Sequence, residues 1–463
     1  MQFTSTPYLF FLPVVFALYW AMHRNTKAQN TLLLVASYTF YGWWDARLLA
    51  IIALMTLATF FAAQRIEAFG DNPKRRKAIC ILAVSLCVLT LGFFKYFNFF
   101  VQSASTLANL AGFEVDAVTL KIILPAGISF YTFQCISYIV DVYRRDTRAS
   151  RDIIAYAVFI AFFPQLVAGP IERAPRMLAI FNSPRHFCYS QSVEGLRRIM
   201  IGLFKKMVIA DNCAETVSAV FSSWSSHGSL VLMYTAVLFT IEIYCDFSGY
   251  SDIAIGSAKL FGIDLSENFR APYLSKSIVE FWRRWHITLM QWFRDYIYIP
   301  LGGGRSHKTR NTFIVFALSG LWHGANYTFV LWGIYNAALF APFRRLQKRP
   351  LPSIAMWLLT FVCVVVGFTI FRSNSIGDAM GYMARAFSFV QLSALPPFAT
   401  HSLIAITAAA LLMFAEIRAG KDRCITSIFG SMPRGARMAA YIAIVCATII
   451  FGAEPAAFIY FQF

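Results

Sequence analysis

The sequence predicts an all-α polytopic membrane protein, and its composition and its apolar runs are the observations that predict it. Hydrophobic residues make up 58% of the 463 residues and charged residues only 14%, whereas soluble domains have about 45–50% and about 25%. Runs close to the roughly 20 residues that a spanning helix needs recur along the chain. Examples are residues 48–63, 78–94 and 353–371. No long polar segment is left over, so we expect one integral membrane domain over residues 1–463.

The basic residues lie in short loops between the apolar runs. The formal net charge is +18, which could indicate a nucleic-acid partner, but the charges cluster at 74–77, 144–151, 344–349 and 418–423. The stretch 96–120 holds no Lys or Arg. This alternation is the positive-inside pattern of membrane proteins. We therefore assign the charge to topology and to anionic lipid headgroups, and we expect no nucleic-acid partner.

The two ends of the chain predict regular crossings. Residues 1–22 lack the basic segment that opens a signal sequence, and Arg24 and Lys27 follow them, so we expect an uncleaved first helix with its N-terminus outside. Runs at 353–371, 403–414 and 439–452 alternate across the membrane. We expect about eleven to thirteen transmembrane or re-entrant helices, with both termini outside.

Simple alternation fails after Asp152. Residues 153–173 are long enough to cross, yet basic residues follow them, and Pro164 and the Gly169/Pro170 pair interrupt their end. Proline removes a backbone donor and breaks helices. Broken backbone at membrane depth is tolerated where protein or a water-filled cavity surrounds it. We predict a re-entrant segment that returns to the cytoplasmic side.

A second interruption is expected at "ALSGLWHGANYTFVLWGIYN", residues 317–336. Arg310 precedes this stretch and Arg344 follows it, so both ends are expected in the cytoplasm, although about 20 residues suffice for one span. We predict a hairpin broken at its glycines, with His323 near its tip. Two long bent helices that divide the residues differently are the alternative.

Residues 277–305 predict a helix with two unlike faces, too charged to cross and suited to the inner membrane interface. His286 falls at the edge of the aromatic face and is therefore expected to point inward. The "GGG" at 302–304 is expected to form a tight turn beside Arg305. At 100° per residue, the aromatic face holds Trp282, Trp285, Leu289, Trp292, Phe293 and Tyr296, and the polar face holds Glu280, Arg283, Arg284, Gln291, Arg294 and Asp295.

His323 and His286 are thus the two histidines expected in the protein interior. Ionisable groups at membrane depth are costly and mark function by default. Desolvation favours the neutral imidazole, which is the form that a general base needs. The alternatives are a hydrogen-bonded packing histidine at 323 and a ring that braces the interfacial helix at 286. The other five are expected in solvent: His23, His186, His227, His307 and His401.

Other familiar chemistries are absent from the sequence. The nine cysteines are scattered, without a CxxC pair or a histidine at metal-ligand spacing, so we expect buried filler and no metal site. The sequence has no GxSxG motif and no P-loop.

Two motifs carry a resemblance to a known family. "EFWRRWHITLMQWFRDYIYIPLGG" and "SGLWHGANYTFVLWGIYN" resemble the membrane-bound O-acyltransferase family, and within it the bacterial polysaccharide, alginate-type O-acetyltransferase branch. The segments 129–144, 162–173, 244–273 and the terminal "FIYFQF" also fit that branch. The core motifs span about residues 129–341.

The resemblance implies a fold with helices around a central tunnel or funnel. It implies that His323 is the active-site histidine and His286 the second one. It further implies acetyl-CoA as the acyl donor without a permanently bound cofactor, a bacterial inner-membrane location, and an extracytoplasmic polysaccharide acceptor. An SGNH-type, esterase-like partner protein is expected to complete the transfer.

Eight further residues are expected to bind substrates. Arginines near the inner interface suit a phosphorylated donor, although plain anchoring is the alternative. Asn326, with backbone N–H groups freed at Gly320 and Gly324, could polarise the thioester carbonyl. Asp246 and Tyr250, with Ser248 and Asp252, could line the cavity or pack helices. The expected set is Asn326, Trp322, Arg283, Arg284, Trp285, Asp295, Asp246 and Tyr250.

Rival functions remain open on the sequence alone. Broken helices and buried polar groups also suit a small-solute transporter, although inverted repeats are not evident. Within the enzyme class, the acceptor could be an alginate-like polymer, cellulose or peptidoglycan. Transfer of D-alanine to teichoic acid, and of acyl groups to lipids or secreted proteins, are the further alternatives.

Overall fold

The computed structural model describes residues 1–390, 400–454, 456, 458 and 459, and over these residues the secondary structure is helical, without a strand. The all-α prediction is confirmed. The helices form two compact units: unit 1 is Met1–Gln191 with Ala258–Leu265, and unit 2 is Ser192–Ser257 with Ser266–Phe463. The single domain stays a prediction. The last four residues of the "FIYFQF" motif lie outside the described residues.

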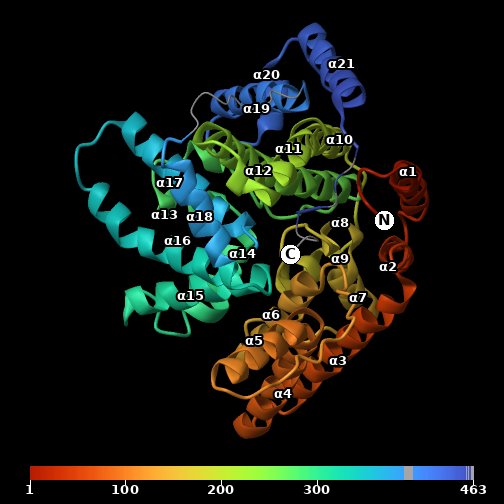
Figure 1. The fold of residues 1–463 in the computed structure, drawn as a ribbon. Helices are drawn as coiled ribbons and strands as arrows, with labels where there is room; N and C mark the ends of the chain where they lie inside the picture. The colour runs from red at the N-terminus through yellow and green to blue at the C-terminus, as the bar shows by residue number, and fades with distance from the viewer. Residues whose placement is uncertain (391–399, 455, 457, 460–463) are drawn as a thin grey trace. The chain divides into compact units, whose positions relative to one another are not determined.

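In unit 1, α3 (Leu49–Ala68), α4 (Pro73–Leu91) and α6 (Ile128–Arg144) pack against one another in pairs (Figure 1). Asn72 begins α4 because its side chain accepts a hydrogen bond from Arg75 N, and Pro73 follows it at the first helical position. The other elements are α1 (Thr6–Ala21), α2 (Thr26–Gly42), η1 (Ala46–Leu48), η2 (Gly92–Tyr96), α5 (Phe97–Leu110), α7 (Ile153–Ala161), α8 (Phe163–Leu166) and α9 (Ala174–Phe181).

The segment predicted to be re-entrant is broken in the structure. Helix α7 has nine residues, which span about 14 Å, against the roughly 30 Å of a bilayer core. The chain leaves the helix at Phe162, and α8 adds only four residues around Pro164. The break is confirmed, because no single helix of this segment could cross. The return to the cytoplasmic side stays a prediction.

Unit 2 is built around the 32-residue helix α12 (Ser229–Leu260), whose residues up to Ser257 belong to this unit. Helix α10 (Tyr189–Leu203) enters the unit at Ser192. The remaining elements are η3 (Phe204–Ala210), α11 (Asp211–Ser222), η4 (Trp224–Ser226), η5 (Pro272–Leu274), α13 (Ile278–Arg284), α14 (Ile287–Phe293), η6 (Arg294–Tyr298), α15 (Lys308–His323), α16 (Tyr327–Leu346), α17 (Ser353–Arg372), α18 (Ile376–Ala386), α19 (Thr400–Ala419), η7 (Ile425–Ser427), α20 (Ile428–Ser431) and α21 (Arg434–Phe451).

Six helices among the described residues are long and apolar enough to cross a membrane. They contain the runs predicted at 48–63, 353–371, 403–414 and most of 439–452, while α1 is apolar but shorter. The predicted total of about eleven to thirteen helices also includes short and re-entrant ones. A count of long apolar helices does not test that total. The six are Ala46–Ala68, Pro73–Leu110, Ser229–Leu260, Ser353–Arg372, Thr400–Ala419 and Arg434–Phe451.

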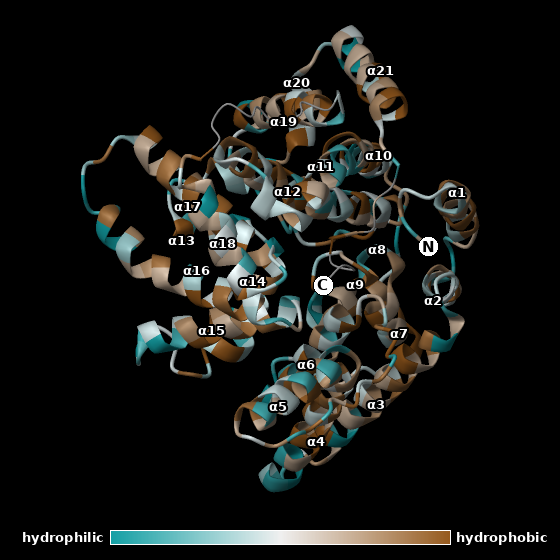
Figure 2. Cartoon of the chain, viewed as in Figure 1, coloured by the Kyte–Doolittle hydropathy of each residue, from teal (hydrophilic) through white to brown (hydrophobic). Residues whose placement is uncertain are grey.

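The outer surfaces of these helices are suited to lipid. Leu82 and Leu89 on α4 are 72% and 70% exposed, and α21 buries none of its residues. In Figure 2 helices such as α3 and α7 are largely brown, and the start of α15 is teal. Apolar exposure on this scale is rare on a soluble monomer. The chain is therefore a multi-pass membrane protein.

The hairpin predicted at residues 317–336 is present as α15 and α16, which pack closely side by side (Figure 1). The chain turns at Gly324, and His323 is the last residue of α15, so its place at the tip is confirmed. Gly320 does not break the helix, however. A Cβ added there would lie 2.0 Å from the Phe329 carbonyl oxygen, so this glycine allows the two helices to approach.

The continuous amphipathic helix predicted over residues 277–305 is wrong. Helix α13 ends at Arg284 and α14 begins at Ile287, because His286 has left-handed backbone angles (φ 43°, ψ 53°) that stop the helical repeat. The inward direction of His286 is confirmed, since its side chain is 1% exposed. The turn predicted at "GGG" is also confirmed, with positive φ at Gly302 and Gly303.

Candidate active site

The two predicted catalytic histidines both contact one tryptophan in unit 2. The centroid of the Trp322 ring is 5.9 Å from that of His286 and 5.0 Å from that of His323. All three side chains are buried. His286 comes from the break between α13 and α14, and His323 and Trp322 come from the end of α15. The fold therefore brings together residues that lie 37 positions apart in the sequence (323 − 286).

The environment of His323 is aromatic. Trp332 of α16 and Phe371 of α17 present their rings at near-perpendicular angles, with centroids 5.2 Å and 5.4 Å from that of the imidazole. The side chain is 4% exposed. Residues of α15, α16 and α17 thus enclose the imidazole among aromatic side chains.

His286 lies among aromatic side chains and contacts a buried amide. Its Nδ1 is 3.0 Å from Oδ1 of Asn268, and the Phe247 ring lies edge-on at 4.7 Å between centroids. Burial lowers the pKa of His286 to about 3. The imidazole is therefore neutral at neutral pH and able to accept a hydrogen bond.

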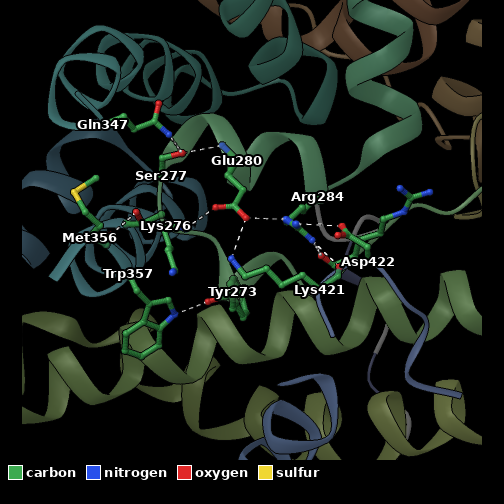
Figure 3. A network of polar contacts seen from close by, with 12 residues as sticks. Tyr273, Lys276, Ser277, Glu280, Arg284, Gln347, Met356, Trp357, Lys421 and Asp422 are labelled. Carbon is green, nitrogen blue, oxygen red and sulfur yellow. Dashed lines mark hydrogen bonds and ion pairs between the residues drawn. The ribbon is translucent and has the colours of Figure 1, made fainter. Parts of the chain in front are cut away.

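The two adjacent arginines have different environments. Arg284 contacts the Glu280 carboxylate (3.2 Å) and donates to the Lys421 carbonyl oxygen (2.6 Å), and Lys421 Nζ reaches the same carboxylate at 3.1 Å. Figure 3 shows this network, in which Glu280 lies between Arg284 and Lys421. These contacts anchor the end of α13 and agree with the anchoring alternative, and a binding role for Arg284 stays a prediction.

Arg283 is exposed and faces a pocket of about 460 Å³. Arg294 and Arg344 line the same pocket, and Trp282 and Phe340 supply apolar surface. Asp295, another expected binding residue, pairs with Arg294 at 2.7 Å. Three guanidinium groups around one concave surface form a region of positive charge that suits phosphate groups.

Trp285 belongs to a buried aromatic cluster. Its ring centroid lies 5.1 Å from those of Phe269 and Phe368, and 5.5 Å from that of Phe281. The indole is 2% exposed. Its contacts hold α13 against its neighbours, and a binding role for it stays a prediction.

Asn326 caps a helix. Its side-chain oxygen accepts a hydrogen bond from Thr328 N (3.0 Å) at the start of α16, and its Nδ2 donates to the Asn374 carbonyl oxygen (2.8 Å). Both ends of the amide are used in joining the α15–α16 turn to the residues after α17. The capping role explains this residue, and the oxyanion role stays a prediction.

Asp246 and Tyr250 take part in packing on α12. Lys206 Nζ lies 2.8 Å from Asp246 Oδ1 and 2.7 Å from Asp211 Oδ1. The Tyr250 ring contacts that of Phe458 at 4.3 Å. These contacts agree with the helix-packing alternative, and a role in lining the cavity is not tested.

Sequence reasoning missed two sets of residues. Asn268, which contacts His286, lies in a loop and has no distinctive sequence signal by itself. Lys205 and Lys206 are buried in unit 2, and Lys205 Nζ lies 2.8 Å from Asp252. Two lysines within the apolar stretch 201–210 could have indicated buried acidic partners. Among the residues that the structure describes, no cluster of His, Cys, Asp and Glu could hold a metal ion.

Comparison with known proteins decides the family. The profile of the membrane-bound O-acyltransferase family matches residues 147–374, a range that includes both histidines. The probable alginate O-acetylase of Pseudomonas putida is 42% identical over 397 residues, which cover 84% of this chain and 81% of that protein. The chain belongs to the membrane-bound O-acyltransferase family. The resemblance stated from the motifs is thereby confirmed.

Other members of the membrane-bound O-acyltransferase family are also similar. The probable alginate O-acetylase of Pseudomonas aeruginosa is 41% identical, over 84% of this chain and 75% of that protein. The peptidoglycan O-acetyltransferase of Helicobacter pylori is 34% identical, over 82% and 78%. As a membrane-bound O-acyltransferase, this chain is a multi-pass enzyme that transfers an acyl group from a donor to an oxygen atom.

Proposed function

We propose that the chain transfers acetyl groups from cytoplasmic acetyl-CoA, across the bacterial inner membrane, for O-acetylation of an extracytoplasmic alginate-like polysaccharide. The observation that carries the proposal is the pair of buried histidines whose rings both contact that of Trp322. It occurs in a chain 42% identical to a probable alginate O-acetylase. An extracytoplasmic SGNH-type partner is proposed to complete the transfer to the polymer.

The proposed reaction uses His323 as a general base. Its imidazole takes the proton of the acceptor hydroxyl as the oxygen attacks the thioester carbonyl carbon. The ester C–O bond forms, the C–S bond breaks, and the proton passes to the sulfur, which leaves as the CoA thiol. His286, with a neutral ring, holds one of the substrates by hydrogen bonding. Direct acylation of His323, followed by transfer to the acceptor, is the alternative route.

The donor is proposed to enter at the pocket that Arg283 lines. Its three arginines supply charge for the CoA phosphates. The pocket includes Ile287 and Met290 of α14, and His286 immediately precedes that helix. A phosphate group held there would therefore lie close to the segment that presents His286.

The acceptor is proposed to approach from the other end of the α15–α16 hairpin. A pocket of about 320 Å³ lies there, lined by Arg372, Asn374, Trp224 and others. Arg372, which lines this pocket, directly follows Phe371 in the sequence, and the Phe371 ring contacts that of His323. The Arg372 guanidinium could pair with a carboxylate of the polymer, and the Trp224 ring could pack against a sugar ring.

Peptidoglycan is the second candidate acceptor. The peptidoglycan O-acetyltransferase of H. pylori is 34% identical, against 42% for the probable alginate O-acetylase of P. putida. The higher identity favours the alginate-like polymer, and analysis of both polymers from the same cells separates the two.

The proposal is tested by measuring ester-linked acetate on the extracellular polymer and on peptidoglycan in cells that depend on this chain. His323→Ala and His286→Ala should each abolish acetylation at unchanged protein level. His186→Ala is the matched control, because that ring is exposed. Retained acetylation in the His323 variant would rule out the general-base role. Solute uptake that depends on the chain, without polymer acetylation, would favour the transporter.

A further inference from the structure

The break that carries His286 is held by a neighbouring loop, residues 266–271. Arg270 N donates to the Arg284 carbonyl oxygen (3.0 Å) at the end of α13. Ile287 N donates to the Asn268 carbonyl oxygen (3.0 Å) at the start of α14. The left-handed backbone of His286 therefore lies between two backbone hydrogen bonds to one loop, which stabilise an otherwise costly conformation.

The Asn268 side chain makes a third connection, to the imidazole itself. It is fully buried, and its Oδ1 lies 3.0 Å from His286 Nδ1, 3.0 Å from Thr288 Oγ1 and 3.4 Å from Thr288 N. On its other side, Nδ2 lies 3.4 Å from Ser251 Oγ. The amide thus faces the histidine with one end and α12 with the other.

The contacts determine which end of the amide faces the histidine. The Thr288 backbone N–H can only donate, so the Asn268 atom that meets it must be the carbonyl oxygen. That oxygen can only accept, so His286 Nδ1 must donate and carry the proton. In a neutral imidazole the lone pair is then on Nε2.

We propose that Asn268 is a positioning residue for catalysis, which orients the His286 ring and selects the tautomer with its lone pair on Nε2. Nε2 is then the nitrogen that His286 presents to substrate. The inference rests on the proposed function, because it gives His286 a place in the reaction. It adds a residue that acts through His286 and does not itself contact the reacting atoms.

The kinetic test compares Asn268→Ala, Asn268→Asp and His286→Ala in the full-length enzyme, in membranes, with acetyl-CoA as the varied substrate. A positioned group that takes part in proton transfer contributes about 10²–10⁴-fold, and misorienting such a group should cost less than removing it, so Asn268→Ala should lower kcat by at least about tenfold. Asn268→Asp keeps an accepting oxygen at the same place and should restore most of the lost kcat. A comparable loss in both variants would overturn the proposal.

A spectroscopic measurement tests the tautomer directly. ¹⁵N NMR of the full-length, histidine-labelled protein in lipid, with His286→Ala for assignment, should report a protonated Nδ1 and an unprotonated Nε2. Asn268→Ala should give a mixture of tautomers, and Asn268→Asp should not give the Nε2–H form. A wild-type protein with the Nε2–H tautomer would overturn the proposal, even if Asn268→Ala failed to fold.

A matched buried asparagine separates positioning from general packing. Asn311 is equally buried and donates to the carbonyl oxygens of Leu301, Gly303 and Ser306. Asn311→Ala should lower thermal stability without changing the His286 tautomer. If His286→Ala keeps full activity, the proposed role of His286 fails. If His286→Ala is inactive while Asn268→Ala has the wild-type kcat, only the positioning role fails.

Discussion

Gly320 of α15 lies against the backbone of Phe329 on α16: a Cβ added to Gly320 would lie 2.0 Å from the Phe329 carbonyl oxygen. That oxygen belongs to a helix backbone and cannot rotate away as a side chain would. The packing that encloses His323, three residues later, therefore requires a glycine at this position.

Gly320→Ala should destabilise the protein by about 1–3 kcal/mol, the usual cost of overpacking, and should displace His323. The measurement is the unfolding temperature of the purified protein in detergent, together with its acyltransferase rate. Gly304→Ala is the control, because an added Cβ there would make only an ordinary 3.7 Å contact with Tyr298. Equal effects of the two substitutions would contradict the prediction.

Arg283 and Arg284 should affect different quantities although they are adjacent. Arg283→Ala removes a pocket-lining charge and should raise KM for acetyl-CoA by about tenfold or more, since a hydrogen bond to a charged group contributes about 1.5–3 kcal/mol. Steady-state kinetics at fixed ionic strength measure the change. An unchanged KM would exclude the donor pocket.

Arg284→Ala should instead lower thermal stability, because Arg284 pairs with Glu280 within α13 and ties the end of that helix to the Lys421 carbonyl oxygen. KM for acetyl-CoA should change less than in Arg283→Ala. The same kinetic and unfolding measurements on both variants make the comparison, and a larger KM effect at Arg284 would reverse the assignment of the two roles.

Lys206 is buried beside Asp211 and Asp246, so Lys206→Met should destabilise strongly. Removing one partner of a buried ion pair leaves an uncompensated charge and costs about 3–5 kcal/mol. Lys74→Met is the control, since Lys74 is exposed. Thermal unfolding in detergent measures the unfolding temperatures of both variants. Similar values would show that the buried ion pair contributes little to stability.

His286 should make stability depend on pH. Burial lowers the pKa of His286 to about 3 in the folded protein, against about 6.5 in the unfolded chain. Between these two pH values the unfolded state binds one more proton than the folded state. The contribution of His286 to the free energy of unfolding is therefore complete above about pH 6.5 and is lost as the pH falls toward 3, at about 1.4 kcal/mol per pH unit. Unfolding temperatures of wild type and His286→Gln at pH 7, 6 and 5 test this. The wild-type protein should lose more stability on acidification, and parallel curves would contradict the burial.

Local patterns in the sequence determined the class of the protein and the place of one histidine. Apolar runs and basic loops are properties of consecutive residues, so the membrane helices and the hairpin with His323 at its tip could be predicted. The motifs around His286 and His323 were also sufficient to indicate the family, which the similarity to known relatives confirmed.

Only the tertiary structure decided how the site is assembled. A helical wheel of residues 277–305 places His286 on a continuous helix, but hydrogen bonds from the loop at 266–271 end that helix and turn the residue into the left-handed region. The different environments of Arg283 and Arg284 depend on Lys421, more than 130 residues away in the sequence (421 − 284 = 137). Such contacts join residues that are distant in sequence, and no local pattern encodes them. The contact between Trp322 and His286 has the same origin.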